Sequence, residues 1–199
     1  FAKHAVQPSG FVEPAFNQWH YWSPGQVDSV PNLIVAFYHS TMTTGDSDFL
    51  RAHWPQILRV ARYMQGLQSN TTGLVQDPGD PGTSQAKPGN GYDNINFGYL
   101  DAVVNLDVAK ALNALSQMAE FLGEDATAFR GQHSTFVESY NNVFWNASAS
   151  LYSDWVDASG ERRNYFFTGH QFEAMDPLSG IANATRARAM LAAIDDRVR

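Results

Sequence analysis

The stretch "GQVDSVPNLIVAFYHSTMTTGDSDFLRAHWPQI", residues 25–57, holds the pattern that decides the fold. Apolar residues recur at spacings of three and four on both sides of "TTGD", residues 43–46, and this is the period of a helix with one buried face. Gly45 is a typical C-terminal stop, and Asp46 or Ser47 is a typical N-cap for a following helix. The stretch predicts two helices joined by a tight turn, at about 31–44 and about 48–67.

The rest of the chain continues this arrangement, with short and long connections in alternation. Apolar spacing predicts a third helix with a nearly all-apolar inner face, ended by Gly123, and a fourth helix after a tight turn. The predicted segments are helices at about 99–122 and 125–144, an extended stretch at 151–156, a turn at 157–160, a short apolar segment at 171–178 and a helix from about 183. We therefore predict an all-α fold of antiparallel helical hairpins with short β or extended loop segments.

Length and composition indicate one folded domain over residues 1–199. Hydrophobic residues make up 44% of the chain and charged residues 17%, which is typical of a domain with a real core. The net charge of −7 comes without a basic stripe that would neutralise phosphates, so a nucleic-acid partner is not expected. No apolar run approaches the ~18 residues of a membrane span. The chain has no cysteine, and we expect no metal and no cofactor.

Three Asn-x-Ser/Thr sequons bear on where the protein acts. They begin at Asn70, Asn146 and Asn183, and they matter only if the chain is secreted. The sequence shows no signal peptide, begins at Phe1 rather than Met, and stops within a helical pattern at Arg199. We expect a processed or partial chain, with an extracellular glycoprotein as the favoured setting.

The loop "GNGYDNINFG", residues 89–98, is the most unusual segment between two predicted helices. It contains one carboxylate, Asp93, next to the ring of Tyr92 and the amide of Asn94. Because Asn, Asp and Gly tolerate tight turns, a turn is one interpretation of this loop. The other is a sugar site in which Asp93 is the general acid, since desolvation by rings without nearby cations favours the protonated carboxyl. The loop alone leaves both interpretations open.

Four segments carry a resemblance to a known group of enzymes, and they occur in the same order. They are residues 25–57, "GYDNINFG" at 91–98, "DAVVNLDVAKALNALSQMAEFLGE" at 101–124 and "FWNASASLYSDWVDASGE" at 144–161. Together they resemble the six-hairpin glycosidases, the (α/α)6-barrel enzymes that include trehalase, processing α-glucosidase and the glucosidase domain of glycogen-debranching enzyme. The chain departs from trehalase-like loops at residues 89–91, where a glutamate, a serine and a glycine are usual. A complete barrel needs twelve helices, about twice what this chain supplies.

The resemblance implies a glycoside hydrolase with a carbohydrate substrate, inverting and exo-acting on α-glucosides or related small glycans. It implies Asp93 as the general acid, and about half of a catalytic barrel that the remainder of the chain or a second copy completes. The family's catalytic base is usually a glutamate near the C-terminal end of the barrel, a region expected beyond Arg199. Within this chain, Glu173 is the candidate for a second carboxylate, because it is a glutamate in a loop-like apolar context late in the sequence. The substrate-binding candidates are the aromatic stretch Trp19, His20, Tyr21 and Trp22, together with Asp28, Tyr92, Asn94 and Asn105.

Several of these residues have a structural interpretation that stays open. Asp28 fits an N-cap, and Asn105 fits a buried amide that must find hydrogen-bond partners. Glu173 fits helix packing or a sugar ligand, and Asp154 fits a structural role. A non-catalytic glycan-binding or structural helical domain is therefore one alternative to the hydrolase. A sugar epimerase or polysaccharide lyase on the same toroid is another, although the histidines form no obvious pair by spacing: His20, His39, His53, His133 and His170.

Overall fold

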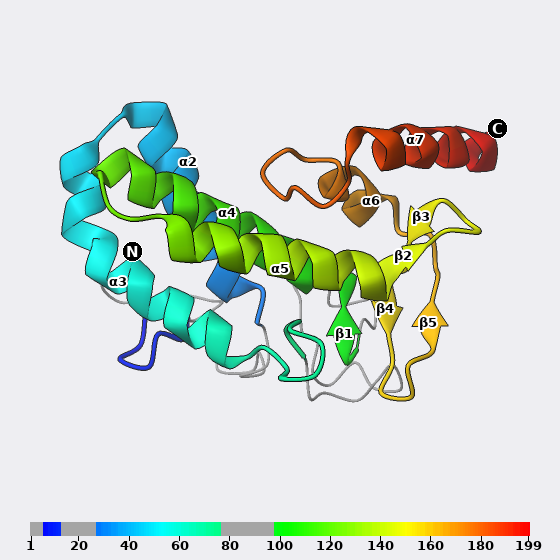
Figure 1. Ribbon diagram of the computed structural model, residues 1–199, viewed down its shortest axis with the longest axis horizontal. Coiled ribbons are helices and arrows are strands. Elements are labelled where there is room, and N and C mark those ends of the chain that lie inside the picture. Colours follow the sequence, from blue (N-terminus) through cyan, green and yellow to red (C-terminus); the bar gives the residue numbers. More distant parts are fainter. Residues whose placement is uncertain (1–5, 13–26, 77–97) are drawn as a thin grey trace, which may run out of the picture.

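The computed structural model describes residues 6–12, 27–76 and 98–199, which form helical hairpins with a few two-residue strands (Figure 1). The all-α class with short β segments is confirmed, and the described residues form no closed barrel. The helices are α2 (Ser29–Thr44), α3 (Ser47–Gly66), α4 (Ala102–Leu122), α5 (Thr127–Phe144), α6 (Thr168–Ala174) and α7 (Ala184–Val198).

The first hairpin forms as its sequence predicts. Gly45 adopts the left-handed conformation, with φ of 69°, and its N–H donates to the carbonyl of Thr41. The carboxylate of Asp46 then accepts from the N–H of Phe49 and caps α3. A residue with a Cβ is disfavoured at such a φ, so glycine at position 45 ends α2 at low cost.

Two predicted boundaries were wrong, and both have a physical cause. The third helix begins at Ala102 rather than near residue 99, because Leu100 and Asp101 pair as strand β1. Asp101 is the N-cap of α4, and its carboxylate accepts from the N–H groups of Val103 and Val104. The predicted apolar segment at 171–178 is instead the second half of α6 and the turn that follows it.

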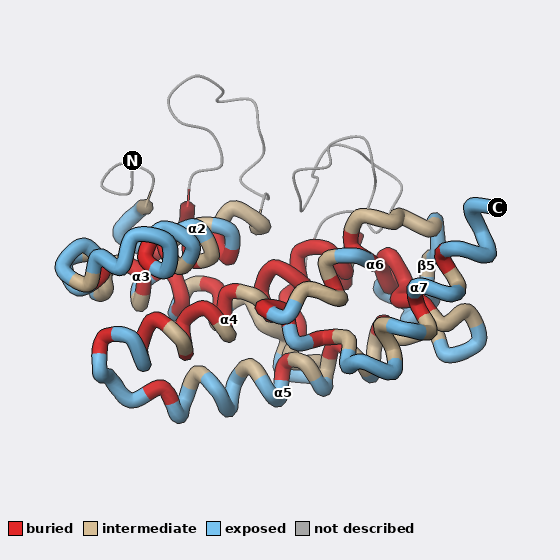
Figure 2. Tube along the Cα trace, turned by 90° about the horizontal axis from the view of Figure 1, so that it is seen from above, coloured by how far each residue is buried: buried red, intermediate tan, exposed pale blue. Residues whose placement is uncertain are grey.

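Helix α4 lies at the centre of the fold, against α2, α3, α5 and α6. Figure 2 shows it buried along nearly its whole length, whereas α5 exposes its outer face. Each fully buried Leu, Val or Met side chain contributes about 1.5–3 kcal/mol to folding, so this helix holds the core together. Although α4 is strongly apolar, no helix in the described part of the chain is suited in length and apolar character to cross a membrane.

Helices α2 and α4 run in the same direction, as two side-chain hydrogen bonds show. Near the helix starts, the Asn32 amide donates to the Asp107 carboxylate at 3.2 Å. Further along both helices, the Tyr38 hydroxyl donates to the Gln117 side chain at 2.9 Å. Positions that advance together along two helices indicate a parallel pair, so both helices begin at the same end of the molecule.

Helix α6 begins at that same end, and the helices between them run the opposite way. Lys110 contacts Glu173 in α6, and Asn113, further along α4, reaches the carbonyl of Leu178 beyond α6. In contrast, the Tyr140 hydroxyl, near the end of α5, donates to the carbonyl at the start of α4. The starts of α2, α4 and α6 therefore lie at one end, which we call the N-terminal end of the inner helices.

Short strands tie this end of the fold together. Strand β1 (Leu100–Asp101) pairs with β4 (Trp155–Val156), which pairs with β5 (Arg162–Arg163), all antiparallel. A second pair joins β2 (Trp145–Asn146) to β3 (Leu151–Tyr152). The extended stretch predicted at 151–156 is thus two strands that belong to different sheets, with Ser153 and Asp154 between them.

The structural role expected for Asp154 is confirmed. Its buried carboxylate accepts from three successive backbone N–H groups, those of Tyr165, Phe166 and Phe167. Phe166 has a φ of 61°, a conformation that side chains with a Cβ rarely adopt. The carboxylate therefore holds the chain in the turn that leads into α6.

Replacement of Asp154 is expected to destabilise the fold. Asp154→Ala leaves three partly buried N–H groups without their acceptor, which costs about 1–3 kcal/mol in the free energy of unfolding. Urea unfolding followed by circular dichroism measures this change. Asp195→Ala is the control, because its side chain is exposed on α7 and pairs only with Arg199, so a change within about 0.5 kcal/mol is expected. Equal stability of the two variants would contradict the role given to Asp154.

Candidate functional site

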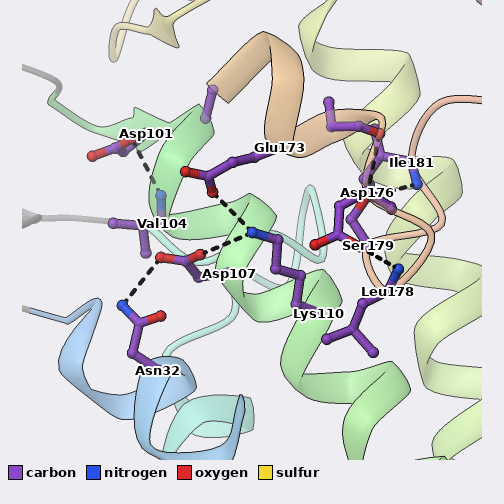
Figure 3. A network of polar contacts seen from close by, with 12 residues as sticks. Asn32, Asp101, Val104, Asp107, Lys110, Glu173, Asp176, Leu178, Ser179 and Ile181 are labelled. Carbon is purple, nitrogen blue, oxygen red and sulfur yellow. Dashed lines mark hydrogen bonds and ion pairs between the residues drawn. The ribbon is translucent and has the colours of Figure 1, made fainter. Parts of the chain in front are cut away.

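A polar cluster lies where the N-terminal halves of α2 and α4 meet α6 (Figure 3). Asn32 comes from the first turn of α2, Asp107 and Lys110 from the second and third turns of α4, and Glu173 from α6. Asp28 precedes α2, and its charge acts on Asp107. We refer to these five residues as the polar cluster.

Lys110 is the centre of the polar cluster. Its Nζ lies 2.9 Å from Oε2 of Glu173 and 3.9 Å from Oδ1 of Asp107. The other oxygen of Asp107, Oδ2, accepts a hydrogen bond from the Asn32 amide. The cluster therefore joins α2, α4 and α6 through side chains rather than through backbone.

The position of Asp107 and Lys110 on α4 is unusual for charged residues. The two are spaced i, i+3, which places them on one face of the helix, and that helix is otherwise almost entirely apolar. Burial of a charge without a partner is costly, so such residues occur where they are paired or where they act on something. Here each has a partner, and the Glu173 side chain that pairs with Lys110 is 37% exposed.

Burial raises the pKa of Asp107 from 3.8 to about 7. The Lys110 ammonium and the Asn32 amide oppose this increase, whereas the charges of Glu173 and Asp28 add to it. The carboxyl of Asp107 is therefore divided between its protonated and ionised forms near neutral pH. A carboxyl with this property can donate or accept a proton under physiological conditions.

Asp28 occupies the N-cap position of α2, but its side chain makes no capping hydrogen bond. Asp28 therefore stands at the predicted N-cap position, but its side chain does not cap the helix. Its charge instead raises the pKa of Asp107, which is why Asp28 is counted in the polar cluster. A contact of Asp28 with a sugar stays a prediction.

Asn105 has backbone partners for its whole amide. Its Oδ1 accepts from the N–H of Val75 at 2.7 Å, and its Nδ2 donates to the carbonyls of Val75 and Asp101. The side chain is fully buried, so it satisfies the buried-amide interpretation. Its contact with a sugar stays a prediction, and these bonds show what it already does, which is to hold the chain at Val75 against α4.

Most of the other predicted site residues lie outside the described residues. These are Trp19, His20, Tyr21, Trp22, Tyr92, Asp93 and Asn94. The described residues that flank them are nevertheless placed. Ser29 at the start of α2 donates to the carbonyl of Val12, and Val75 is bonded to Asn105 near the start of α4. Each of the segments 13–26 and 77–97 is therefore flanked by residues at the N-terminal end of the inner helices.

A second buried polar group surrounds His170. Its Nδ1 lies 3.4 Å from the Asp154 carboxylate, and burial lowers the pKa of His170 to about 4. The neighbouring Gln171 accepts from the N–H of Tyr152 and donates to its carbonyl. These contacts fix β3 against α6, so their role is structural. Among the described residues, no group of three or more His, Asp or Glu side chains is arranged to hold a metal ion.

The sequence did not single out Asp107, Lys110 or Asn32. The available signal was a pair of opposite charges, spaced i, i+3, inside a helix whose other residues are nearly all apolar. Only Glu173 and Asp28 were named among the five members of the polar cluster. The structure thus brings together two residues that the sequence analysis named and three that it did not.

Solved structures of known proteins share this fold. The chain is similar to a GH78 family rhamnosidase of Bacillus sp. GL1, with a TM-score of 0.64 and 22% identity over 81% of this chain and 17% of that one. It is similar to a rhamnosidase from Klebsiella oxytoca with rhamnose bound, with a TM-score of 0.66 and 15% identity over 94% of this chain and 33% of that one. An uncharacterized conserved protein from Thermus thermophilus gives a TM-score of 0.65 and 14% identity over 96% of this chain and 61% of that one.

These similarities concern the fold, because sequence identity is low in each. No protein-family model matches the sequence, and no curated protein matches it either. The chain spans between 17% and 61% of the length of the three structures. Two of the three are named as rhamnosidases, which are glycosidases. Their fold agrees with the helical-hairpin fold that the sequence predicts.

The raised pKa of Asp107 predicts how stability changes with pH. The folded state holds the proton more tightly than the unfolded state, so this carboxyl stabilises the fold below pH 4, and the stabilisation is lost as the pH rises toward 7. Asp107→Asn removes this dependence, and relative to the variant the wild type loses roughly 2–4 kcal/mol between pH 4 and pH 7.5. Urea unfolding at several pH values measures the difference.

Asp125→Asn is the control with the opposite sign. Hydrogen bonds from the side chain and N–H of Thr127 lower the pKa of Asp125, so its contribution is present at neutral pH and lost as the pH falls below 4. A wild-type curve that runs parallel to that of Asp107→Asn from pH 4 to pH 7.5 would contradict the protonation assigned to Asp107.

Proposed function

We propose that this chain is part of a glycoside hydrolase of the six-hairpin kind. The observation that carries the proposal is the gathering of three carboxyls in the half of the fold that holds the starts of α2 and α4: Asp28 before α2, Asp107 in α4 and Glu173 in α6. Both segments with the predicted sugar-site residues, 13–26 and 77–97, are flanked by residues in that same half. Function commonly resides on long connections at one end of a rigid helical scaffold. The fold similarity to two rhamnosidases adds support.

In the proposed reaction, Asp93 is the general acid that protonates the leaving glycosidic oxygen. A second carboxylate activates a water molecule on the opposite face of the sugar, which inverts the anomeric centre. Glu173 is the candidate for this second carboxylate among the described residues, because its side chain is partly exposed and belongs to the polar cluster. The aromatic stretch from Trp19 to Trp22 is proposed as a wall of the sugar subsite.

Two substrate classes follow from different observations. The sequence resemblance favours α-glucosides or related small glycans, attacked from a chain end. The two similar rhamnosidase structures add rhamnosides. The remainder of the same chain, or a second copy, is proposed to complete the barrel around the three inner helices.

Replacement of Asp93 tests the proposed chemistry. Asp93→Asn keeps the size of the side chain and removes the proton donor, so turnover of nitrophenyl α-glucosides and rhamnosides is expected to fall about 10²- to 10⁴-fold. Binding of the free sugar is expected to remain. Proton NMR of the first product formed by the wild type is expected to show the inverted anomer.

Asp80→Asn is the matched control, since Asp80 lies in the same segment within the turn-rich sequence "DPGDPG". Its turnover is expected to equal that of the wild type. Unchanged turnover by Asp93→Asn would remove Asp93 from the mechanism. A wild type that binds sugars without hydrolysing any glycoside would identify a glycan-binding domain instead.

A further inference from the structure

The Lys110–Glu173 ion pair has unused hydrogen-bonding capacity. Within the described part of the chain, Lys110 donates to Oε2 of Glu173, and Oε1 keeps its capacity to accept. An ammonium group carries three N–H donors, and one of them makes this hydrogen bond. The pair thus offers a donor on Nζ and an acceptor on Oε1, from two side chains that are joined by the 2.9 Å contact between Nζ and Oε2.

The pair is also held in place before any ligand arrives. The Lys110 side chain is only 12% exposed, and its Nζ lies between the carboxyls of Glu173 and Asp107. Asp107 is in turn fixed by the Asn32 amide from α2. A donor and an acceptor that are held rigidly lose little freedom when they bind a ligand, which is what a binding site requires.

The charge of the polar cluster restricts the ligand. Two carboxyls, those of Asp107 and Glu173, lie next to the Lys110 ammonium, and the charge of a third, Asp28, acts on Asp107. This balance repels anionic ligands. The described residues also offer no set of three or more His, Asp or Glu groups for a metal ion. A neutral ligand with several hydroxyl groups suits the remaining donor and acceptor.

We propose that Lys110 and Glu173 bind two adjacent hydroxyl groups of a saccharide. The Glu173 carboxylate accepts from one hydroxyl, and the Lys110 ammonium donates to the oxygen of its neighbour. Because Nζ and the carboxylate of Glu173 are in direct contact, the remaining donor and acceptor lie close enough together for two neighbouring hydroxyls of one sugar ring to meet both. The choice of a saccharide rests on the proposed function, whereas recognition of the diol does not depend on hydrolysis.

This proposal gives Glu173 a binding role in place of water activation. An oxygen beside an ammonium group is suited to orient a hydroxyl, and Glu173 is fixed by that contact. The second carboxylate of the hydrolase would then come from outside the described residues. Asp107 is a positioning residue in this arrangement, because it holds Lys110 from the buried side.

Binding measurements on the full chain test the proposal, with rhamnose and methyl α-glucoside as probes. Glu173→Gln and Lys110→Met are each expected to weaken binding of at least one probe about tenfold or more, since each removes a charge-assisted hydrogen bond. Glu120→Gln is the matched control, because Glu120 lies in the last turn of the same helix and pairs with Arg130. Its binding is expected to equal that of the wild type.

Monodeoxy analogues of the better probe identify the diol. The wild type is expected to discriminate against an analogue that lacks one of the two hydroxyls, and Glu173→Gln is expected to bind that analogue and the parent sugar equally. Urea unfolding of Glu173→Gln shows whether the variant is folded under the conditions of the binding measurement. Wild-type affinity in both Glu173→Gln and Lys110→Met, or no binding of either probe by the wild type, would overturn the proposal.

The outcome separates this proposal from the hydrolase itself. Hydrolysis by the wild type, combined with unchanged sugar affinity in both variants, overturns the diol site and leaves the hydrolase in place. Sugar binding that depends on Lys110 and Glu173, without hydrolysis by the wild type, supports the diol site and overturns the catalytic proposal.

Discussion

The burial of α4 on all sides is the constraint on which the rest of the structure depends. A helix that is apolar on nearly all of its faces is covered by its neighbours, and α2, α3, α5 and α6 pack against it. Once these neighbours are in place, a polar side chain on α4 can only point at another helix. Asp107 and Lys110 meet partners from α2 and α6 for this reason, and the polar cluster is a consequence of the packing.

The parts of the fold that could be predicted from sequence are those governed by local chemistry. Gly45, Asp46 and Gly123 act on their immediate neighbours, and the helix ends that they mark were predicted correctly. The start of α4 could not be predicted in the same way, because Leu100 pairs with Val156, far along the chain. A two-residue strand has too short a pattern to be detected before its partner is known.

The candidate site shows the same division between local and distant information. Glu173 and Asp28 attracted attention through residue type and position, whereas Asp107 and Lys110 were concealed by the apolar pattern of their helix. Their partners are 75 and 63 residues away in sequence, in the hydrogen bonds to Asn32 and Glu173. Only the packing of three helices makes these residues a cluster, and no single segment contains that information.

The common direction of the inner helices has an electrostatic consequence. Each helix carries partial positive charge at its N-terminus, where backbone N–H groups lack carbonyl partners within the helix. In α2 and α4, which have 16 and 21 residues, these termini lie at the same end of the molecule as Asp28 and Asp101, the residues at their N-cap positions. The helix dipoles offset part of the negative charge gathered there. The fold thus tolerates several carboxyls near one ammonium, because the backbone N–H groups at the starts of α2 and α4 add positive potential to that of the charged side chains.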